Sequence, residues 1–305
     1  MNSSVAIIVL NWNSFEVTND CLHSLAGLTH PSYKVILVDN ASADGSADQL
    51  AAAHPQVVFL RSSANLGFTG GNNIGLRYAL QNGFTYSLIL NNDTLAEPDF
   101  LAKLTAYMDA HREAGAVQPR IFYQHNRQLL WNGGSYYNRF LGWSYTLGEA
   151  KHTHPKYAIR KEVDWITGCA FLVRNSVLQQ SGLFADKFFL YNEDVDLSFR
   201  IRKLGYPLVY EPDAVIYHIA GMSTKSKTKS KEGYVHPLAH YYNQRNRLWI
   251  IKQYTPWYCV PSVALFNFGY LVMVLGYFTM RGRFQKLKAM TRAIKDGIFD
   301  SIQYP

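Results

Sequence analysis

The segment Leu88–Asp93 reads Leu-Ile-Leu-Asn-Asn-Asp, and a turn followed by a helix opening at Glu97-Pro98 is expected after it. An apolar run that ends in polar residues in this way is typical of a fully buried parallel strand. Such a strand would deliver the Asp93 carboxylate to the carboxyl edge of a sheet, where open α/β sheets bind ligands. An Asp after a strand is also common as a simple helix cap, so the rest of the chain must decide its role.

Strands and helices alternate around this segment. The expected strands are Val5–Leu10, Tyr33–Val38, Gln56–Leu60, Tyr86–Leu90 and Ala116–Ile121, and the expected helices are Ser14–Ala26, Ser46–Ala53, Gly70–Gln81 and Pro98–His111. This alternation predicts an α/β fold with a mainly parallel central sheet flanked by helices. Residues 123–165 lose the pattern and are expected to form an insertion of loops and short strands. The pattern then resumes with a strand at Ala170–Val173, a helix from about residue 193 to Leu204 and a short strand at Pro207–Tyr210.

The composition describes a folded protein whose basic charge lies at one end. Of the 305 residues, 48% are apolar and 17% are charged, which excludes a disordered chain. Three widely spaced cysteines indicate free thiols in a reducing compartment, and no secretory signal is expected at the N-terminus. The net charge is +8, yet residues 221–305 alone hold 13 Lys and Arg against 3 Asp and Glu. A basic segment of this kind favours nucleic acid, an anionic membrane or a solvated face.

Two nucleotide-binding motifs are absent from the places where an α/β sheet would need them. The turn after the first expected strand, Leu10–Ser14, has no glycine, whereas a dinucleotide-binding turn needs several so that the backbone can approach a pyrophosphate. The glycine-rich segment Gly67–Gly71 follows the third strand and lacks the lysine of a P-loop. These absences argue against NAD and ATP as ligands.

Acidic residues instead mark the expected ligand edge. Asp39 ends the second strand, Asp93 ends the fourth, and Glu193, Asp194 and Asp196 cluster at the start of a helix. A nucleotide lying across this edge would meet Asp39 at its base or ribose and Asp93 near its phosphates. A single carboxylate beside phosphates suits Mg²⁺ or Mn²⁺, which leave their other positions to phosphate oxygens and water.

Six motifs in order carry a resemblance to a known family. They are Ile7–Asn13 (Ile-Ile-Val-Leu-Asn-Trp-Asn), Val38–Ser42 (Val-Asp-Asn-Ala-Ser), Asn65–Phe68, Asn91–Asp93, Trp165–Gly168 and Asn192–Leu197. Together they resemble a family 2 inverting glycosyltransferase with the GT-A fold, and within that family the bacterial rhamnosyltransferase-like branch. The resemblance covers about residues 5–223. It implies a catalytic domain at 1–223, followed by a C-terminal extension at 224–305.

The resemblance implies a role for each matching residue. Asp194 matches the general base, with Glu193 as its neighbour, and the metal-binding motif reads Asn91-Asn92-Asp93, with one carboxylate where relatives often have two. His218, in His-x-x-Gly-x-Ser, matches a residue at the metal or the departing diphosphate. The implied roles are nucleotide binding for Asn11, Asp39, Asn65, Gly67, Asn91 and Asn92, metal binding for Asp93 and His218, catalysis for Asp194 and Glu193, and acceptor binding for Trp165 and Gly168.

Each of these residues also has a purely structural interpretation. Acidic residues favour a helix N-terminus whether or not they catalyse, which applies most to Asp196. His218 could be a partly buried histidine with satisfied hydrogen bonds. Trp165 could belong to the core, as tryptophans usually do. Gly70 and Gly71 fit a loop beside the donor or the start of a helix equally well.

The C-terminal segment combines an apolar run with a basic helix. Residues 253–280 carry no charge and are long enough to cross a bilayer, although Pro256, Pro261, Asn267, Gly269 and Gly276 argue against a uniform helix. Crossing would put the basic 281–305 segment outside, against the positive-inside rule. Apolar residues from Phe284 to Ile298 recur at helical spacing, which favours a helix lying on an anionic membrane. Re-entrant or in-plane association, a packed soluble or homo-oligomer surface and a true span all remain open. The four lysines of residues 225–231 are expected in a mobile basic loop.

The sequence therefore predicts a metal-dependent inverting glycosyltransferase at the cytoplasmic face of the inner membrane that helps to make a cell-surface polysaccharide. The resemblance implies a nucleotide-diphosphate sugar donor such as dTDP-rhamnose, Mg²⁺ or Mn²⁺, and a saccharide acceptor linked to polyprenyl diphosphate. One alternative is a sugar-1-phosphate nucleotidylyltransferase, which would need a glycine-rich basic loop after the first strand. The other is a basic nucleic-acid-binding protein, which would need basic and aromatic residues on a recognisable module. Neither feature is present, and we expect no nucleic-acid partner.

Overall fold

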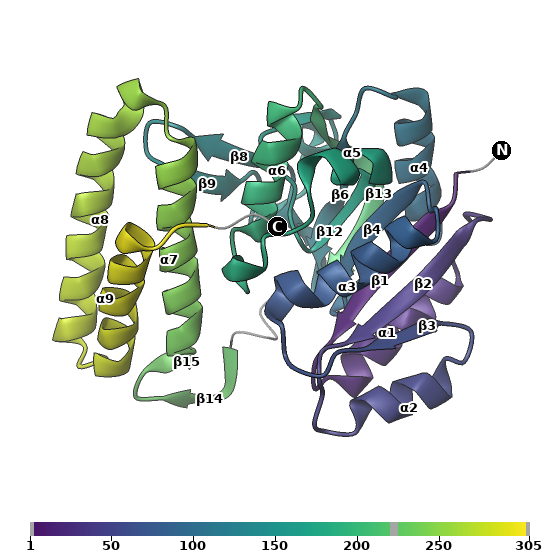
Figure 1. Cartoon of the computed structure of the whole chain (residues 1–305), viewed down its shortest axis with the longest axis horizontal. Coiled ribbons are helices and arrows are strands. Elements are labelled where there is room, and N and C mark those ends of the chain that lie inside the picture. Colours follow the sequence, from purple (N-terminus) through teal and green to yellow (C-terminus); the bar gives the residue numbers. More distant parts are fainter. Residues whose placement is uncertain (1–2, 220–224, 303–305) are drawn as a thin grey trace.

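A mixed sheet crosses the centre of the molecule, and a separate group of helices stands beside it (Figure 1). The computed structural model describes residues 3–219 and 225–302, with side chains for all of these except 225–230. Within these residues the sheet has eleven strands. They are β1 Val5–Asn11, β2 Tyr33–Asp39, β3 Val58–Arg61, β4 Tyr86–Asn91, β5 Thr94–Ala96, β6 Ala116–Tyr123, β7 Asn126–Asn132, β10 Lys151–His152, β11 Lys161–Val163, β12 Ala170–Arg174 and β13 Leu208–His218.

The first four strands form the parallel part of the sheet that the sequence predicts. They lie in the order β3-β2-β1-β4, and every adjacent pair is parallel. Apolar side chains point alternately to the two faces, and β1 is buried on both, which explains its continuous apolar sequence. In register, Asn11 lies opposite Asp39 and Leu10 lies opposite Asn91. The polar ends of three strands therefore meet at one edge.

Beyond β4 most of the pairings are antiparallel. Strand β12 runs antiparallel between β4 and β6, and β13 runs parallel to β6. The far end of β13 pairs with β5, which sets Thr94 opposite His218. Two predicted elements differ from the structure here. The helix α4 begins at Phe100 after the short strand β5, and β13 extends to His218 rather than ending at Tyr210.

Helices cover both faces of the sheet. On one face, α1 and α4 pack with the odd residues of β1, and on the other, α3, α5 and α6 pack with the even ones. The first residue of α3 is Gly67, so Gly71 lies inside this helix, where a Cβ would collide with the Leu10 side chain. The helices of this part are α1 Phe15–Ala26, α2 Ser46–Ala53, α3 Gly67–Gln81, α4 Phe100–Ala110, α5 Asn175–Ser181 and α6 Glu193–Lys203, with 3₁₀ turns at Pro155–Tyr157 and Asp186–Phe188.

The insertion at residues 123–165 consists of loops and short strands, as predicted. Besides β7, β10 and β11 it contains a hairpin of β8 (Ser135–Asn138) and β9 (Trp143–Thr146). This hairpin reaches the C-terminal helices (Figure 1). There the Trp143 ring packs edge-on against the rings of Phe266 and Tyr270.

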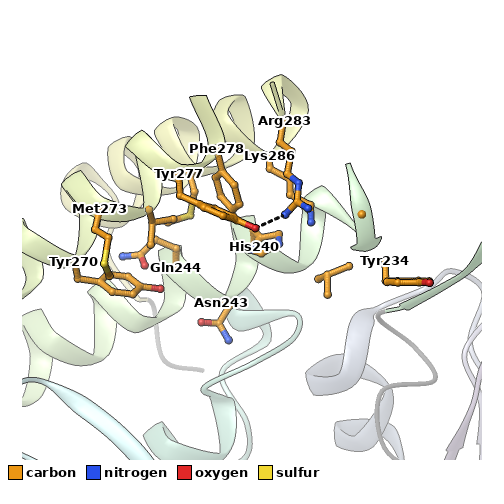
Figure 2. Close-up of a pocket in the computed structure, with 14 residues that line it drawn as sticks. Tyr234, His240, Asn243, Gln244, Tyr270, Met273, Tyr277, Phe278, Arg283 and Lys286 are labelled. Atoms are coloured by element: carbon orange, nitrogen blue, oxygen red, sulfur yellow. Dashed lines mark hydrogen bonds between the residues drawn. The ribbon is translucent and has the colours of Figure 1, made fainter. Parts of the chain in front are cut away.

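The C-terminal segment forms a hairpin and three long helices that run up, down and up (Figure 1). They are β14 Lys225–Ser230, β15 Gly233–Val235, α7 Pro237–Tyr254, α8 Val260–Met280 and α9 Phe284–Phe299, with a 3₁₀ turn at Trp257–Cys259. Residues 225–230 form a strand, not the predicted loop. The regular helix α8 was also not expected. Its Pro261 lies in the first turn, where a proline needs no hydrogen-bonded N–H. A cavity lies between α7, α8 and α9 (Figure 2).

Candidate active site

Asp39 is held at the end of β2 by a buried network of polar side chains. The Asn11 amide Nδ2 donates to Asp39 Oδ1 at 3.0 Å, and the Ser42 backbone N–H donates to Asp39 Oδ2 at 3.1 Å. The Thr18 hydroxyl donates to Asn11 Oδ1, and Asn92 Nδ2 donates to the Thr18 oxygen at 2.7 Å. This chain of bonds joins the end of β2 to the end of β4, because Asn92 directly follows β4 and precedes Asp93.

The network engages two of the asparagines that are predicted to bind the nucleotide. Asn11 is fully buried, and its Nδ2 also lies within hydrogen-bond distance of the hydroxyls of Ser42 and Ser46. A side chain engaged in this way orients Asp39, and the direct contact of Asn11 with a nucleotide stays a prediction. Asn92 is likewise bonded through its Nδ2 to Thr18. Asn91 remains half-buried at the strand end, and its backbone N–H donates to the Cys169 carbonyl at 2.8 Å.

A loop at Asn65–Phe68 lies beside Asp39 and is fixed from both sides. The neighbouring Asn40 donates to Asn65 Oδ1 and to the Gly67 carbonyl, at 3.1 and 3.0 Å. The Phe68 N–H donates to the Phe189 carbonyl at 2.7 Å. Gly67 has a φ of +69°, and a Cβ on it would collide with that same carbonyl oxygen. Glycine is therefore required at this position for two reasons, its φ and the close approach.

Asp93 and His218 face each other at the edge of the sheet. Asp93 Oδ1 lies 3.1 Å from His218 Nε2, and both side chains are buried. The pairing of β5 with β13 brings them together, and the Ile219 N–H donates to the Asp93 carbonyl at 3.0 Å. The Trp131 ring packs edge-on against the imidazole, with ring centres 4.6 Å apart.

This pair fits a divalent cation. Among the described residues, neither Asp93 Oδ1 nor His218 Nδ1 has a hydrogen-bond partner, and the 3.1 Å approach lacks hydrogen-bond geometry. A buried carboxylate oxygen without a hydrogen bond is a suitable ligand for Mg²⁺ or Mn²⁺, and the imidazole adds a nitrogen ligand that Mn²⁺ accepts more readily than Mg²⁺ does. Within residues 3–219 and 225–302, no cluster of three or more His, Cys, Asp or Glu suited to a metal was found. A cation held here would therefore take its remaining ligands from water and from phosphate oxygens. The Gly221 and Ser223 of the His-x-x-Gly-x-Ser motif lie outside the described residues.

Asp194 is positioned at the start of α6. Its Oδ2 accepts the Gly168 N–H at 2.8 Å, and its Oδ1 accepts the Val195 N–H at 2.8 Å. Burial raises the pKa of Asp194 to about 6, although the backbone hydrogen bonds act in the opposite direction. Burial also raises the pKa of Glu193 well above its usual value, and the charge of Asp194 adds to that shift. Paired carboxyl groups with raised pKa values are candidates for acid–base chemistry.

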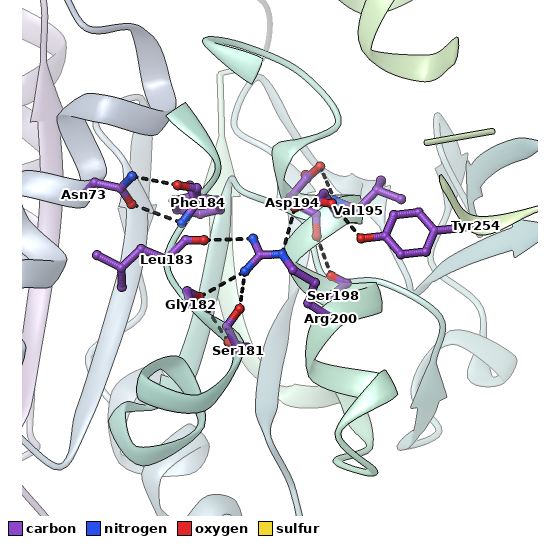
Figure 3. A network of polar contacts seen from close by, with 11 residues as sticks. Asn73, Ser181, Gly182, Leu183, Phe184, Asp194, Val195, Ser198, Arg200 and Tyr254 are labelled. Carbon is purple, nitrogen blue, oxygen red and sulfur yellow. Dashed lines mark hydrogen bonds and ion pairs between the residues drawn. The ribbon is translucent and has the colours of Figure 1, made fainter. Parts of the chain in front are cut away.

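The third acidic residue of this cluster has a structural role. Asp196 is fully buried, and its Oδ2 accepts a bond from Arg200 Nε at 2.9 Å. Its Oδ1 accepts the Tyr254 hydroxyl of α7 at 2.6 Å. Figure 3 shows Arg200 reaching from there to the carbonyls of Ser181, Gly182 and Leu183. Asp196 lies in the first turn of α6, as its structural interpretation predicts, and it also ties α6 to α7 and to the end of α5.

The two predicted acceptor residues differ in their environment. Trp165 is only 9% exposed, packs with Phe188 and Trp249, and donates its indole N–H to the Tyr136 carbonyl at 2.9 Å. Its ring packs in the core in this structure, and acceptor binding by Trp165 stays a prediction. Gly168 lies where an added Cβ would be 3.6 Å from Asp194 Oδ2. Its visible contribution is the N–H that orients Asp194.

Helix α7 contributes residues to this site that the sequence did not reveal. Asn246 Nδ2 lies within 2.9 Å of three carbonyl oxygens, those of Phe188, Leu190 and Tyr191. Arg245 donates to two carbonyls of the same loop. That loop has positive φ values at Phe189, Tyr191 and Asn192 and leads directly into Glu193 and Asp194. A run of polar residues within α7 is the only signal in the sequence, and it does not indicate which loop they would hold.

The sheet edge therefore carries a network of polar side chains, a candidate cation pair and a candidate base. A model of the family described as "Glycosyl transferase family 2" matches residues 5–180. The chain belongs to glycosyl transferase family 2. This confirms the predicted family, and it supports assigning the protein as a glycosyltransferase.

Individual relatives agree with this assignment. The chain is 28% identical over 263 residues to an N-acetylglucosaminyl-diphospho-decaprenol L-rhamnosyltransferase of Mycobacterium tuberculosis, covering 79% of this chain and 81% of that one. It is 23% identical over 303 residues to the dTDP-rhamnosyl transferase RfbF of Shigella flexneri, covering 98% and 96%. The solved mannosyltransferase PcManGT of Pyrobaculum calidifontis, in complex with GDP-Man and Mn²⁺, matches with a TM-score of 0.57 and 15% identity over 98% of this chain and 88% of that one. This likeness confirms the GT-A fold.

Proposed function

We propose that this glycosyltransferase moves rhamnose from dTDP-rhamnose to a saccharide linked to polyprenyl diphosphate, with inversion at the anomeric carbon and with a divalent metal. The observation that carries the proposal is that Asp93 with His218 and Asp194 with Gly168 meet at one edge of the sheet. Asn91 at the end of β4 is bonded to Cys169, and the next residue back, Gly168, is bonded to Asp194. The names of the relatives above support the donor and the acceptor class.

The donor would lie along the ends of β2 and β4. Asp39, fixed by Asn11, would hold the nucleoside, and the Asn65–Phe68 loop would line the same side. Asp93 and His218 would hold Mg²⁺ or Mn²⁺ together with the diphosphate oxygens. When bound, the cation supplies positive charge that stabilises the departing diphosphate.

Asp194 would then act as the general base. It accepts the proton of the acceptor hydroxyl while that oxygen attacks the anomeric carbon from the side opposite the nucleotide. The bond from this carbon to the diphosphate oxygen breaks, and dTDP leaves with the bonding electrons. With a pKa of about 6, Asp194 is mostly ionised at neutral pH and is a stronger base than an ordinary Asp. The raised pKa of Glu193 favours its neutral form beside the ionised Asp194.

The C-terminal helices would hold the enzyme on the cytoplasmic face of the membrane. Trp257–Met280 is the one helical stretch among the described residues that is long and apolar enough to cross a bilayer, and 17% of its most apolar window is buried. Residues along its length, such as Leu265 and Phe268, are mostly exposed. We favour association in the plane of the membrane, because the adjoining α9 is basic and its crossing would violate the positive-inside rule. In this arrangement residues 1–223 form the catalytic domain and 224–305 the membrane-associating extension.

The products of the reaction test this proposal. The full-length enzyme, with Mn²⁺ and a polyprenyl-diphosphate-linked N-acetylglucosamine, would be offered a panel of nucleotide sugars, and lipid products would be followed by mass spectrometry. We expect dTDP-rhamnose to yield dTDP and a rhamnosylated lipid with inverted anomeric configuration. A parallel reaction with dTTP and rhamnose-1-phosphate tests the nucleotidylyltransferase alternative. Release of diphosphate there, with no glycolipid from any donor, would overturn the proposal.

A further inference from the structure

A large cavity lies within the C-terminal helices, outside the site described above. Its volume is about 710 Å³, and it is lined by residues of β15, α7, α8 and α9 (Figure 2). Most of its wall is apolar or aromatic, including Tyr270, Met273, Phe278 and Met290. Cavities of this size and character hold ligands of drug-like size.

One side of the cavity is shared with the exposed apolar face of α8. Met273 and Tyr277 line the cavity and are 65% and 43% exposed. On the same helix Leu265, Phe268 and Met280 are also largely exposed. An apolar chain resting against α8 could therefore enter the cavity without crossing water.

Two cations lie beside Tyr277, whose hydroxyl accepts a bond from Arg283 Nη1 at 3.2 Å. Arg283 and Lys286 both line the cavity, and Figure 2 shows them together above His240. Lys286 is only 3% exposed, and its pKa is lowered by burial and further by the charge of Arg283. The nearby Glu232 carboxylate accepts the backbone N–H groups of Gln285 and Lys286. The charge of Glu232 acts in the opposite direction on the pKa of Lys286, and a bound anion would further offset the repulsion between the two cations.

Two buried polar atoms of the lining point to a missing ligand. Among the described residues, His240 Nε2 and Gln244 Nε2 have no hydrogen-bond partner. Gln244 is 3% exposed, and its Oε1 already accepts a bond from Arg247. Burial and the two cations lower the pKa of His240 to about 4, so this imidazole is neutral at physiological pH. Buried polar groups are rarely left without partners, and phosphate oxygens would provide one for the Gln244 amide.

One wall of the cavity, formed by α7, also contacts the loop that precedes the candidate base. Asn243 lines the cavity, and its carbonyl accepts the Asn192 side-chain amide at 3.4 Å. Asn192 immediately precedes Glu193 and Asp194. Next to Asn243, the Tyr242 ring stacks on the Phe189 ring, with centres 5.0 Å apart. A ligand in the cavity would therefore contact the same turn of α7 that contacts the loop before Asp194.

We propose that this cavity binds an isoprenoid diphosphate, the lipid-linked end of the acceptor, with the chain against Met273 and Tyr277 and the diphosphate at Arg283 and Lys286. This inference rests on the proposed function, which requires an acceptor sugar to reach Asp194. Two clustered cations match the charge of a diphosphate better than that of a membrane phospholipid with a single phosphodiester.

Binding of farnesyl diphosphate by the full-length protein in detergent tests the proposal by calorimetry. We expect saturable binding that Arg283→Gln with Lys286→Gln weakens about a hundredfold, since each lost hydrogen bond from a charged group is worth about tenfold or more. Because Lys286 is buried, Met273→Gln provides a second variant at an exposed position. This variant should weaken the binding of farnesyl diphosphate but leave the binding of inorganic diphosphate unchanged. The matched control is Arg281→Gln with Lys288→Gln, which removes the same charge from exposed positions that do not line the cavity.

Three results would overturn the cavity assignment. They are an equal loss in the control variant, inorganic diphosphate binding as tightly as farnesyl diphosphate, and phosphatidylglycerol vesicles competing equally well. Mn²⁺-dependent binding of dTDP-rhamnose, measured on the same variants, separates this proposal from the proposed function. Normal donor binding and transfer without farnesyl diphosphate binding would rule out the cavity assignment and leave the proposed function standing. Farnesyl diphosphate binding without any donor binding would support the cavity assignment and contradict the proposed function.

Discussion

The sheet edge buries polar side chains, whereas the C-terminal helices expose apolar ones. At the sheet edge, buried Asn11 and Asp39 are joined by hydrogen bonds that fix their positions. Along α8, Leu265 and Phe268 are 76% and 68% exposed. A satisfied polar network holds a precise geometry for a water-soluble ligand, whereas an apolar face of this extent needs another apolar phase to cover it. The comparison suggests that the sheet edge binds the donor and the helices bind the lipid.

The largest expected effect comes from a variant that removes catalysis at the sheet edge and leaves the C-terminal helices unchanged. Asp194→Asn removes the base but keeps the size of the side chain, so kcat should fall about 10²–10⁴-fold. Donor affinity, measured by calorimetry, should stay near that of the wild type, because Asp194 contacts the acceptor in this account. Asp99→Asn, an exposed carboxylate on the far side of β5, serves as the control. Unchanged turnover of Asp194→Asn would show that another group is the base.

The next largest effect comes from a variant that weakens membrane binding by α8 and leaves the sheet edge unchanged. Leu265→Glu with Phe268→Glu places two charges on the exposed face of α8, and binding to anionic vesicles should fall at least about 100-fold, because burying each apolar side chain is worth about 1.5–3 kcal/mol. Sedimentation with vesicles measures the loss, and donor binding should persist. Ile159→Glu is the control, since Ile159 is 60% exposed on the α/β part. If vesicle binding survives and the variant instead loses a dimer in light scattering, α8 is an interface between copies.

A pH profile sharpens the role of the sheet edge. The pKa of Asp194 is raised to about 6 by burial, and the base must be ionised to accept a proton. The rate of transfer should therefore fall about tenfold per pH unit below that value, as a property of the Glu193–Asp194 pair. Asp194→Asn should abolish this dependence. A wild-type rate that stays level down to pH 5 would contradict the assignment.

The smallest effect compares two glycines with nearly the same backbone. Gly67 and Gly83 have φ values of +69° and +70°, but only Gly67 has atoms within 4 Å of an added Cβ. Gly83→Ala should cost about 1–2 kcal/mol of unfolding free energy for the left-handed conformation alone. Gly67→Ala should cost about 1–3 kcal/mol more, because the Phe189 carbonyl must move. Thermal unfolding measures the difference between the two variants. Equal losses of stability would show that the loop at Gly67 and the loop at Phe189 do not constrain each other.

The parallel strands and their carboxylates were predictable from the sequence for a physical reason. Strands buried on both faces must be apolar throughout, so the polar residues at or just after their ends, such as Asp39 and Asp93, are visible in the sequence. The motifs of the family then assigned Asp194. These predictions depend on local patterns, and the structure places the strand ends as expected.

The features that depend on distant pairing could not be read in this way. The three-residue strand β5 exists because it pairs with β13 more than 100 residues away, and that pairing sets His218 beside Asp93. The engagement of Asn11 and the burial of Trp165 also depend on partners from other elements. Helix α7 holds the loop before Asp194 through Asn246, again across a long separation in sequence.

Donor binding with and without Mn²⁺ tests the central claim most directly. Calorimetric titration of the wild type with dTDP-rhamnose should show saturable binding in Mn²⁺ that disappears in EDTA. Asp93→Ala should bind the donor weakly and equally in both, because the carboxylate that would hold the cation is gone. Mn²⁺-stimulated binding that persists in Asp93→Ala would contradict the account.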